Sequence, residues 1–174
     1  MKGSTDVGIL YGDGAIGELG VVEGYVDSDY AGSADTRKSL TGYVFTLFGG
    51  TIMEASLQSM VALSSTETEY VALIEVVKEG LWVRRMIGKL GLAQKTLTVH
   101  YDNQSAIYLI MNTMFHERTK HINVKLHFLR YVVSKCEVVA EKIHTDDNPV
   151  DMLMKALTTI KFKHCLSLIN ILSN

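Results

Sequence analysis

The feature that most constrains the fold is a hairpin pattern followed directly by a long helical pattern. Residues 40–56, LTGYVFTLFGGTIMEAS, hold two runs of apolar, β-branched and aromatic residues around Gly49 and Gly50, which is typical of a β-hairpin. From about Thr66 to about Leu90, apolar residues recur at helical spacing, and Gly91 is a suitable stop signal. A hairpin joined to a long helix favours a sheet with helices packed on it.

Further strand and helix patterns alternate on both sides of this unit. Residues 21–26 predict a strand before the hairpin, and residues 96–101 predict a strand after the helix. Helical patterns follow Asp102 and cover 121–135, a strand pattern covers 136–144, and short helical patterns cover 148–157 and 162–172. The order β-β-β-α-β-α-α-β-α predicts one mixed α/β sheet that begins with three antiparallel strands.

Composition and charge narrow the class of protein. With 174 residues, of which 47% are hydrophobic, the chain suits one globular domain and is too apolar for disorder. It has no apolar run of 18 residues, its start lacks the pattern of a secretory signal, and Cys136 and Cys165 form neither a metal motif nor a disulfide framework. A net charge of -2 gives no global signal for nucleic acids, so such binding must use local basic patches.

Three aspartates lie at predicted element boundaries, and each has a simple structural explanation. Asp27 follows the first of the three antiparallel strands and suits a turn. Asp102 precedes a helix and suits its N-cap. Asp151 suits the third position of a helix that is capped by Asn148 and has Pro149 at its first position. None of the three is a strong signal of catalysis by itself.

Two glutamates at the start of the long helix compete for one structural role. Ser64 with Glu67 forms the capping-box pattern, and Thr66 with Glu69 forms the same pattern in another frame. Only one frame can cap the helix. Capping therefore leaves one of the two glutamates unexplained.

The joint placement of these acids predicts a metal site. In a mixed sheet of this order, the first and fourth strands are expected to be central neighbours, which brings Asp27 and Asp102 to the edge where ligands gather. The helix starts that carry Glu69 and Asp151 are expected over the same edge. Four carboxylates at one place repel one another unless cations lie between them, and oxygen ligands favour Mg²⁺ or Mn²⁺. Two such ions suit the displacement of a phosphodiester.

Five motifs, in this order, resemble those of a known family. GYVDSDYAGSADTRKSLTGYVF, VALSSTETEYVAL, YDNQSAI, RTKHINVKLHFLR and HTDDNPVDMLMKAL are similar to the ribonuclease H domain at the C-terminus of Pol polyproteins of copia-type LTR retrotransposons of the plant kind. The resemblance implies a ribonuclease H-like fold, with a five-stranded mixed sheet and helices on both faces. It also implies a lead-in over residues 1–20 that resembles the end of a reverse transcriptase region, a domain over 21–160 and a helical tail over 161–174.

The resemblance also implies an activity and the residues that perform it. The family hydrolyses the RNA strand of RNA–DNA hybrids during reverse transcription with two Mg²⁺ ions, for which Mn²⁺ is an alternative, and without a small-molecule cofactor or a membrane. By motif, the catalytic and metal-binding residues are Asp27, Glu69, Asp102 and Asp151, which leaves Glu67 as the capping acid. One ion, on Asp27 and Asp151, is expected to activate water, and the other, on Asp27, Glu69 and Asp102, to stabilise the leaving 3′-oxygen. The expected partners are the hybrid and an upstream reverse transcriptase region, in a cytoplasmic retrotransposon particle.

Scattered basic residues are the candidates for contacts with the nucleic-acid backbone. A hybrid is recognised by its shape and 2′-hydroxyls, so a near-neutral total charge is compatible with binding. Cellular ribonucleases H carry a mobile His before the final Asp, but His144 suits a strand end or loop better than that role. We expect Trp82 to lie in the core. The candidates for backbone contact are Arg84, Arg85, Arg118, Lys120, His121, Lys125 and His144.

Some positions depart from the family pattern and keep an alternative function open. Met53-Glu54-Ala55-Ser56 stands where relatives usually have a Trp and a Lys, which exchanges an aromatic for Met and a positive charge for a negative one. The alternative is a degenerate copy that binds nucleic acid or a polymerase partner with weak cleavage or none. An integrase-type nuclease is disfavoured because its acid series ends in Glu and this one ends in Asp151. A calcium-binding protein is disfavoured because the sequence has no compact acidic loop of the EF-hand type.

Overall fold

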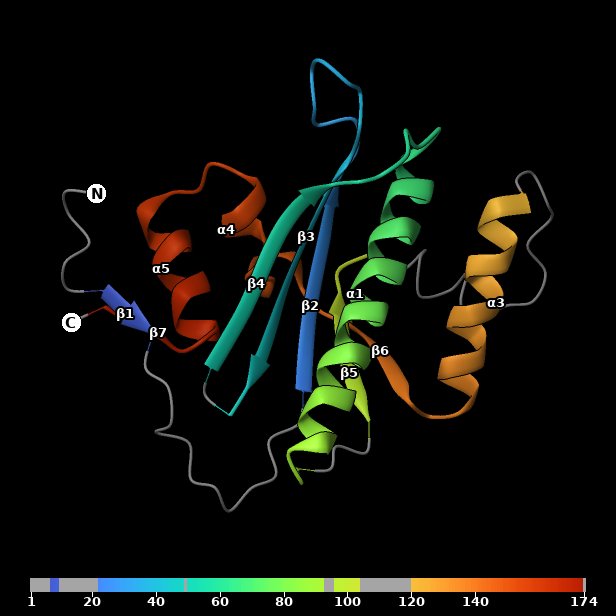
Figure 1. The fold of residues 1–174 in the computed structure, drawn as a ribbon. Helices are drawn as coiled ribbons and strands as arrows, with labels where there is room; N and C mark the ends of the chain where they lie inside the picture. The colour runs from blue at the N-terminus through green and yellow to red at the C-terminus, as the bar shows by residue number, and fades with distance from the viewer. Residues whose placement is uncertain (1–6, 10–21, 49, 93–95, 104–119, 174) are drawn as a thin grey trace.

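A mixed sheet of five strands forms the centre of the fold (Figure 1). The computed structural model describes residues 7–9, 22–48, 50–92, 96–103 and 120–173. The strand order is β4-β3-β2-β5-β6. The predicted mixed sheet of five strands is therefore confirmed. Its antiparallel strands are β2 (Val22–Asp29), β3 (Leu40–Leu47) and β4 (Gly50–Leu57), and β5 (Leu97–Tyr101) and β6 (Val138–Lys142) run parallel to β2.

Helices cover both faces of this sheet, as predicted (Figure 1). One face carries α1 (Ser65–Lys89) and α3 (Lys120–Ser134). The other carries α4 (Asp151–Met154) and α5 (Thr159–Leu168), which follow a short 3-10 helix, η1 (Thr145–Asp147). The helix predicted after Asp102 falls mainly on residues 104–119, outside the described ranges. Among the helices that are described, none is long and apolar enough to cross a membrane.

The start of α1 resolves the competition between the two glutamates. The Ser64 hydroxyl accepts a hydrogen bond from the Glu67 backbone N–H at 3.2 Å, and the Glu67 carboxylate accepts one from the Leu63 backbone N–H at 2.7 Å. Two backbone donors near the helix start are thereby satisfied. Glu67 is the capping acid, as predicted, and Glu69 is left for another role.

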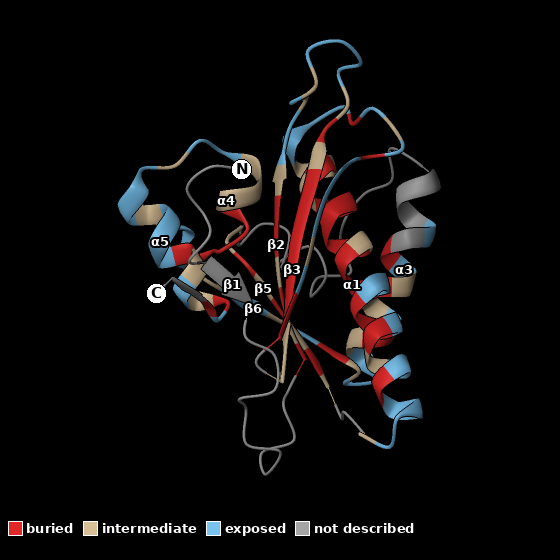
Figure 2. Ribbon diagram, turned by 60° about the vertical axis from the view of Figure 1, so that its left-hand side comes forward, coloured by how far each residue is buried: buried red, intermediate tan, exposed pale blue. Residues whose placement is uncertain are grey.

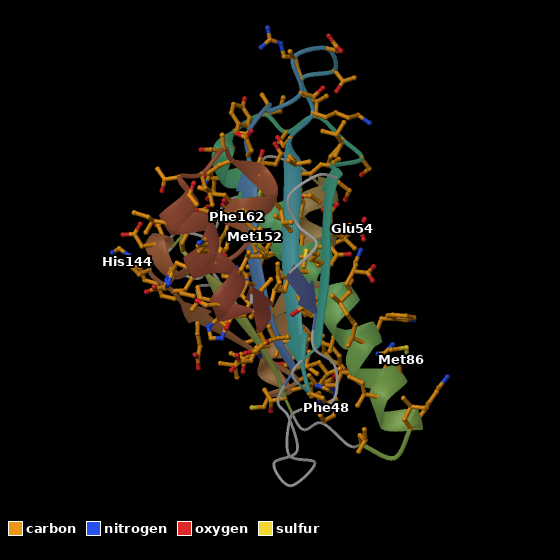
Figure 3. The ribbon with its side chains drawn as sticks, turned by 90° about the vertical axis from the view of Figure 1, so that its left-hand side faces the viewer. Phe48, Glu54, Met86, His144, Met152 and Phe162 are labelled. Atoms are coloured by element: carbon orange, nitrogen blue, oxygen red, sulfur yellow. The ribbon has the colours of Figure 1, made fainter. Side chains whose placement is uncertain are left out.

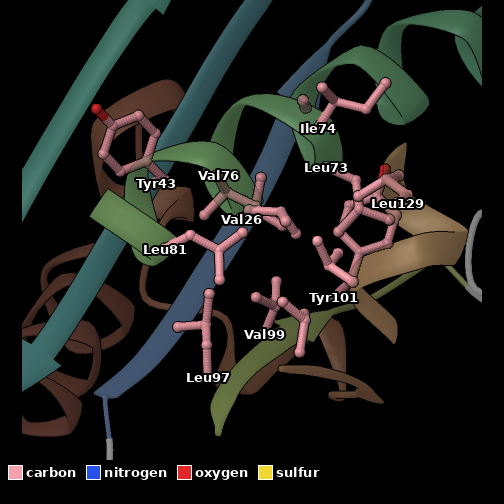
Figure 4. Close-up of a cluster of buried hydrophobic side chains, with 14 of the residues drawn as sticks. Val26, Tyr43, Leu73, Ile74, Val76, Leu81, Leu97, Val99, Tyr101 and Leu129 are labelled. Carbon is pink, nitrogen blue, oxygen red and sulfur yellow. The ribbon is translucent and has the colours of Figure 1, made fainter. Parts of the chain in front are cut away.

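The larger hydrophobic core fills the space between α1, α3 and the sheet. Figure 2 shows that the buried side of α1 faces the strands while its outer side is exposed, and Figure 4 shows the side chains that meet between them. Burying one large apolar side chain contributes about 1.5–3 kcal/mol, so this layer holds α1 firmly on β2 and β5. Its almost fully buried members include Val22, Val26, Leu73, Ile74, Leu97, Val99, Tyr101 and Leu129.

The prediction that Trp82 lies in this core is wrong. Its side chain is 58% exposed on the outer side of α1. The face of the helix that meets the sheet is filled by Leu81 and by Val77, one turn earlier. Trp82 is rotated by about 100° from Leu81, which turns its indole away from the strands.

A smaller core lies between the other face of the sheet and the C-terminal elements. Val44, Val150, Ile169 and Ile171 are its buried members, and the Thr51 hydroxyl donates to the Ile169 carbonyl at 2.6 Å. The predicted tail helix ends earlier than expected, at the end of α5. The residues that follow form β7 (Ile171–Ser173), which pairs antiparallel with β1 (Val7–Ile9) in a separate two-stranded sheet.

Candidate active site

The C-terminal edge of β2 and β5 carries two of the four predicted acids. Asp27 lies within β2, opposite Gly42 of β3, so the explanation of Asp27 as a turn residue is wrong. The strand is longer than predicted because its pairing with β3 continues to Asp29. β2 and β5 are parallel neighbours, as predicted. Asp102 directly follows β5 and therefore lies at the same edge as Asp27.

Asp151 lies in the C-terminal part of the chain and reaches this edge on α4. It is the first residue of that helix, whose N-cap is Val150. The predicted helix start at Pro149, with Asn148 as the cap, is therefore wrong. The Asp151 side chain is only 6% exposed, and an ionised carboxylate buried to this extent requires charged or hydrogen-bonding partners.

Asn148 has a different role, which the sequence did not reveal. Its fully buried side chain donates to the Val26 carbonyl at 3.0 Å and accepts from the Val150 N–H at 3.2 Å. Val26 immediately precedes Asp27, and Val150 immediately precedes Asp151. Asn148 thus fastens the two backbone segments that carry these acids to each other.

Lys155 joins the carboxylates of Asp27 and Asp151. Its Nζ lies 3.0 Å from Asp27 Oδ2 and 2.8 Å from Asp151 Oδ1. Lys161 of α5 lies 3.4 Å from the second Asp151 oxygen, Oδ2. Burial lowers the pKa of Lys155, but its hydrogen bonds to Asp151 and Asp27 outweigh this effect and raise the pKa overall. Sequence reasoning missed both lysines, although Lys155 follows Asp151 by four residues, which is the spacing of a helical ion pair.

Glu69 and Asp102 extend the acidic edge beside Asp27. Burial raises the pKa of Glu69; a hydrogen bond with Asn103 opposes this rise, and the charges of Asp102 and Asp27 add to it. Burial also raises the pKa of Asp27. The contact with Lys155 and the hydrogen bond from the Ser28 N–H lower this pKa, but by less than burial raises it. The structure therefore brings all four predicted acids to one edge, where three of them interact electrostatically.

The donor chemistry of this edge fits a hard divalent cation. All four predicted ligands are carboxylates, which Mg²⁺ and Mn²⁺ prefer. Burial, and then the charges of neighbouring carboxylates, raise the pKa of Asp27 and of Glu69, and a bound cation would act in the opposite direction. Within the described part of the chain, no three His, Cys, Asp or Glu side chains are already gathered into a metal-binding group. Metal binding by these acids therefore stays a prediction.

Of the predicted backbone-contact residues, the structure describes the side chains of Arg84, Arg85 and His144. Arg84 donates to the Glu137 carbonyl at 2.8 Å and lies 3.3 Å from its carboxylate, so it links α1 to the residue that precedes β6. At 1.5 Å per residue, Arg84 and Arg85 are about 22 and 24 Å along the helix from Glu69. His144 is exposed at the edge of the molecule, where its ring caps η1 (Figure 3). The side chains of Arg118, Lys120, His121 and Lys125 lie outside the described set.

Comparison with curated proteins identifies relatives over the whole chain. The chain is 44% identical over its full length to the retrovirus-related Pol polyprotein from transposon TNT 1-94 of Nicotiana tabacum. It is 33% identical, over 94% of its length, to the Pol polyprotein from transposon RE2 of Arabidopsis thaliana. The chain belongs to the retrovirus-related Pol polyproteins of plant transposons. It spans only 13% and 11% of the length of these two relatives, and no family model matches it.

Solved structures show the fold of this Pol segment. RNase H1 from Halobacterium salinarum has a TM-score of 0.53 at 14% identity, over 78% of this chain and 94% of that one. LC11-RNase H1, isolated from compost, has a TM-score of 0.56 at 16% identity, over 76% of this chain and 91% of that one. The predicted ribonuclease H fold is therefore confirmed. A second structure of LC11-RNase H1 is a complex with an RNA/DNA hybrid. Its TM-score to this chain is 0.51 at 15% identity, over 73% of this chain and 88% of that one.

Proposed function

We propose that this Pol segment hydrolyses the RNA strand of RNA–DNA hybrids during reverse transcription. The observation that carries the proposal is the contact of Asp27 and Asp151 across one ammonium, at the strand edge that also holds Glu69 and Asp102. The hybrid bound to LC11-RNase H1, which shares the fold, supports the substrate class. Plant Pol relatives support a place in retrotransposition.

In this proposal the four acids would hold two Mg²⁺ ions, with Mn²⁺ as the alternative. Such ions would supply an activated water and charge stabilisation at the scissile phosphate. The protein's own contribution is to fix the ligands: β2 holds Asp27, α1 holds Glu69, β5 leads into Asp102, and the turn fastened by Asn148 holds Asp151. No protein nucleophile takes part, and the products are a 5′-phosphate and a 3′-hydroxyl.

The proposal places the segment in a longer Pol polyprotein, downstream of a reverse transcriptase region and in a cytoplasmic particle. The support is the small share of the relatives' length that this chain spans. Residues 1–20 are then the connection to that region, residues 21–160 the ribonuclease H domain and residues 161–174 its tail. The pairing of β1 with β7 would fasten this connection to the C-terminal part of the domain.

The test is cleavage of a hybrid labelled on its RNA strand, in Mg²⁺ and then in EDTA. Loss of a metal ligand in Asp27→Asn is expected to lower cleavage at least about 100-fold. Mutation of residues that only hydrogen-bond to metal ligands already lowers metal affinity or activity by about 10- to 100-fold. Asp29→Asn removes the same charge from the exposed end of β2 and is expected to stay within about twofold of the wild type.

Two outcomes would contradict the proposal. Equal cleavage by the wild type and by Asp27→Asn would show that the acidic edge is not the active site. The second is a folded chain that binds the hybrid, as measured by fluorescence anisotropy, but does not cleave it with either metal ion. That result would support the degenerate, binding-only copy instead.

A further inference from the structure

The active-site edge contains a cation that the chain itself supplies. Lys155 Nζ contacts one carboxylate oxygen of Asp27 and one of Asp151, at 3.0 and 2.8 Å. Both carboxylates are buried, with side-chain exposures of 10% and 6%. A monovalent ammonium therefore lies between these two buried carboxylates and compensates their negative charge.

A divalent ion on these two carboxylates would compete with Lys155 for the same negative charge. Two cations held by the same pair of oxygens repel each other at short range. Occupation of the site by one of the two cations therefore works against occupation by the other.

Lys155 is the cation that can leave. Its side chain is 47% exposed, and it is the C-cap residue of the four-residue helix α4, with an extended backbone. A change of side-chain rotamer is enough to move its ammonium into solvent. Neither helix nor sheet has to be rearranged.

Lys161 is less exposed than Lys155 and is held by more contacts. Its side chain is 22% exposed, and its Nζ lies 3.3 Å from the Thr145 carbonyl, 3.2 Å from Asp146 Oδ1 and 3.4 Å from Asp151 Oδ2. It contacts Asp151 Oδ2, leaving Oδ1 to Lys155. Lys161 can thus stay in place while Lys155 moves.

We propose that Lys155 is a tethered counter-ion, whose ammonium neutralises Asp27 and Asp151 in the metal-free chain and is displaced when a divalent cation binds them. The inference rests on the proposed function only in taking these two acids as metal ligands. It assigns Lys155 a positioning role: the ammonium keeps two buried carboxylates together until the metal arrives, and it sets the metal concentration that the site requires.

The experiment is isothermal titration of the full chain with MgCl₂, without nucleic acid. Lys155→Met removes the competing charge and keeps most of the apolar stem, so Mg²⁺ is expected to bind about fivefold more tightly, as for the loss of a partly exposed ion pair. Lys155→Gln, which keeps a polar end group, is expected to change affinity in the same direction. Lys155→Arg keeps the charge and is expected to bind Mg²⁺ more weakly than Lys155→Met.

Lys163→Met is the matched control, because it removes the same charge from an exposed position on α5; its Mg²⁺ affinity is expected to stay within about twofold of the wild type. Thermal unfolding gives a second readout. In EDTA, Lys155→Met is expected to melt below the wild type, since two buried carboxylates lose their counter-ion, and Mg²⁺ is expected to raise its melting temperature more than that of the wild type.

Unchanged or weaker Mg²⁺ binding by folded Lys155→Met and Lys155→Gln would overturn the inference. If the wild type binds Mg²⁺ and loses this binding in Asp27→Asn, that result leaves the proposed function standing. Absence of Mg²⁺ binding in every folded variant would overturn the inference together with the metal site on which the proposed function depends.

Discussion

Asn148→Ala tests how the two halves of the active-site edge are held together. The substitution removes a buried amide that donates to the Val26 carbonyl at 3.0 Å and accepts from the Val150 N–H at 3.2 Å. Leaving a buried donor or acceptor unpaired costs about 1–3 kcal/mol each. Allowing for partial relaxation around the small cavity, we expect the free energy of unfolding to fall by about 2–4 kcal/mol. For a chain of this size that corresponds to a melting temperature lower by roughly 5–15 °C.

Urea unfolding in EDTA measures this loss, and the hybrid assay measures its effect on the site. Because Asn148 ties the residue before Asp27 to the residue before Asp151, cleavage by folded Asn148→Ala is expected to fall at least about tenfold, through misplacement of the acids. A stability loss below about 0.5 kcal/mol, which is typical of a surface substitution, would refute the role given to this amide.

Asn148→Asp separates the two hydrogen bonds. The introduced carboxyl keeps an acceptor for the Val150 N–H but, when ionised, has no donor for the Val26 carbonyl. Burial raises its pKa in the folded state, so its penalty is absent below the unfolded value of about 3.9 and grows as pH rises through the folded value. The variant should therefore be less stable than the wild type at pH 7 and approach it at acid pH. A difference that does not change with pH would contradict this account.

Three further predictions concern the fold around the site. Gly42→Ala places a methyl group 2.7 Å from the Val150 side chain and 2.8 Å from the Met154 sulfur, so urea unfolding should show a loss of about 1–3 kcal/mol, and the hybrid assay should show weaker cleavage as α4 is pushed away from β3. Glu69→Gln removes a carboxyl whose pKa is raised mainly by burial. Through this carboxyl, the wild type should lose stability as pH rises above the ordinary pKa of 4.5. Unfolding in EDTA at acid and neutral pH should show that the variant lacks this pH-dependent loss of stability. Trp82→Ser should change the free energy of unfolding by less than about 1 kcal/mol, and a loss of 3 kcal/mol or more, typical of a buried Trp, would contradict its exposed position.

The sequence predicted the elements whose periodicity is set by one regular buried face. Leu73, Val77 and Leu81 recur at helical spacing and all lie in the core, and the hairpin pattern corresponds to β3 and β4. Periodicity did not separate Trp82 from Leu81, because adjacent apolar residues leave the orientation of a helix face undetermined. Local capping rules were also sufficient to nominate Glu67, since a cap depends only on residues within one turn.

The parts of the site that the sequence did not predict depend on contacts between distant residues. Asn148 bonds to a strand residue 122 positions earlier, and Lys155 contacts an acid 128 positions earlier. A local pattern made Asn148 a helix cap, because Asn before Pro and an acid is typical of a helix start. Asn148 Oδ1 does accept locally, from the Val150 N–H, and the contact that no local pattern indicates is the bond from Nδ2 to β2. The pairing of β1 with β7 has the same origin, since it joins residues about 160 positions apart in the chain.

Met53 and Glu54, which are expected from the sequence to depart from the family pattern, have structural partners on the adjacent strand. Met53 lies opposite Val44 in the β3–β4 pair and packs against the smaller core. Glu54, on the edge strand β4 (Figure 3), accepts a hydrogen bond from the Tyr43 hydroxyl at 2.7 Å. β4 pairs with β3 over all eight of its residues, so Met53 and Glu54 are compatible with this edge of the sheet. The degenerate-copy alternative therefore cannot rest on a weakened fold at this strand, and it has to be decided by the cleavage of a hybrid at the acidic edge.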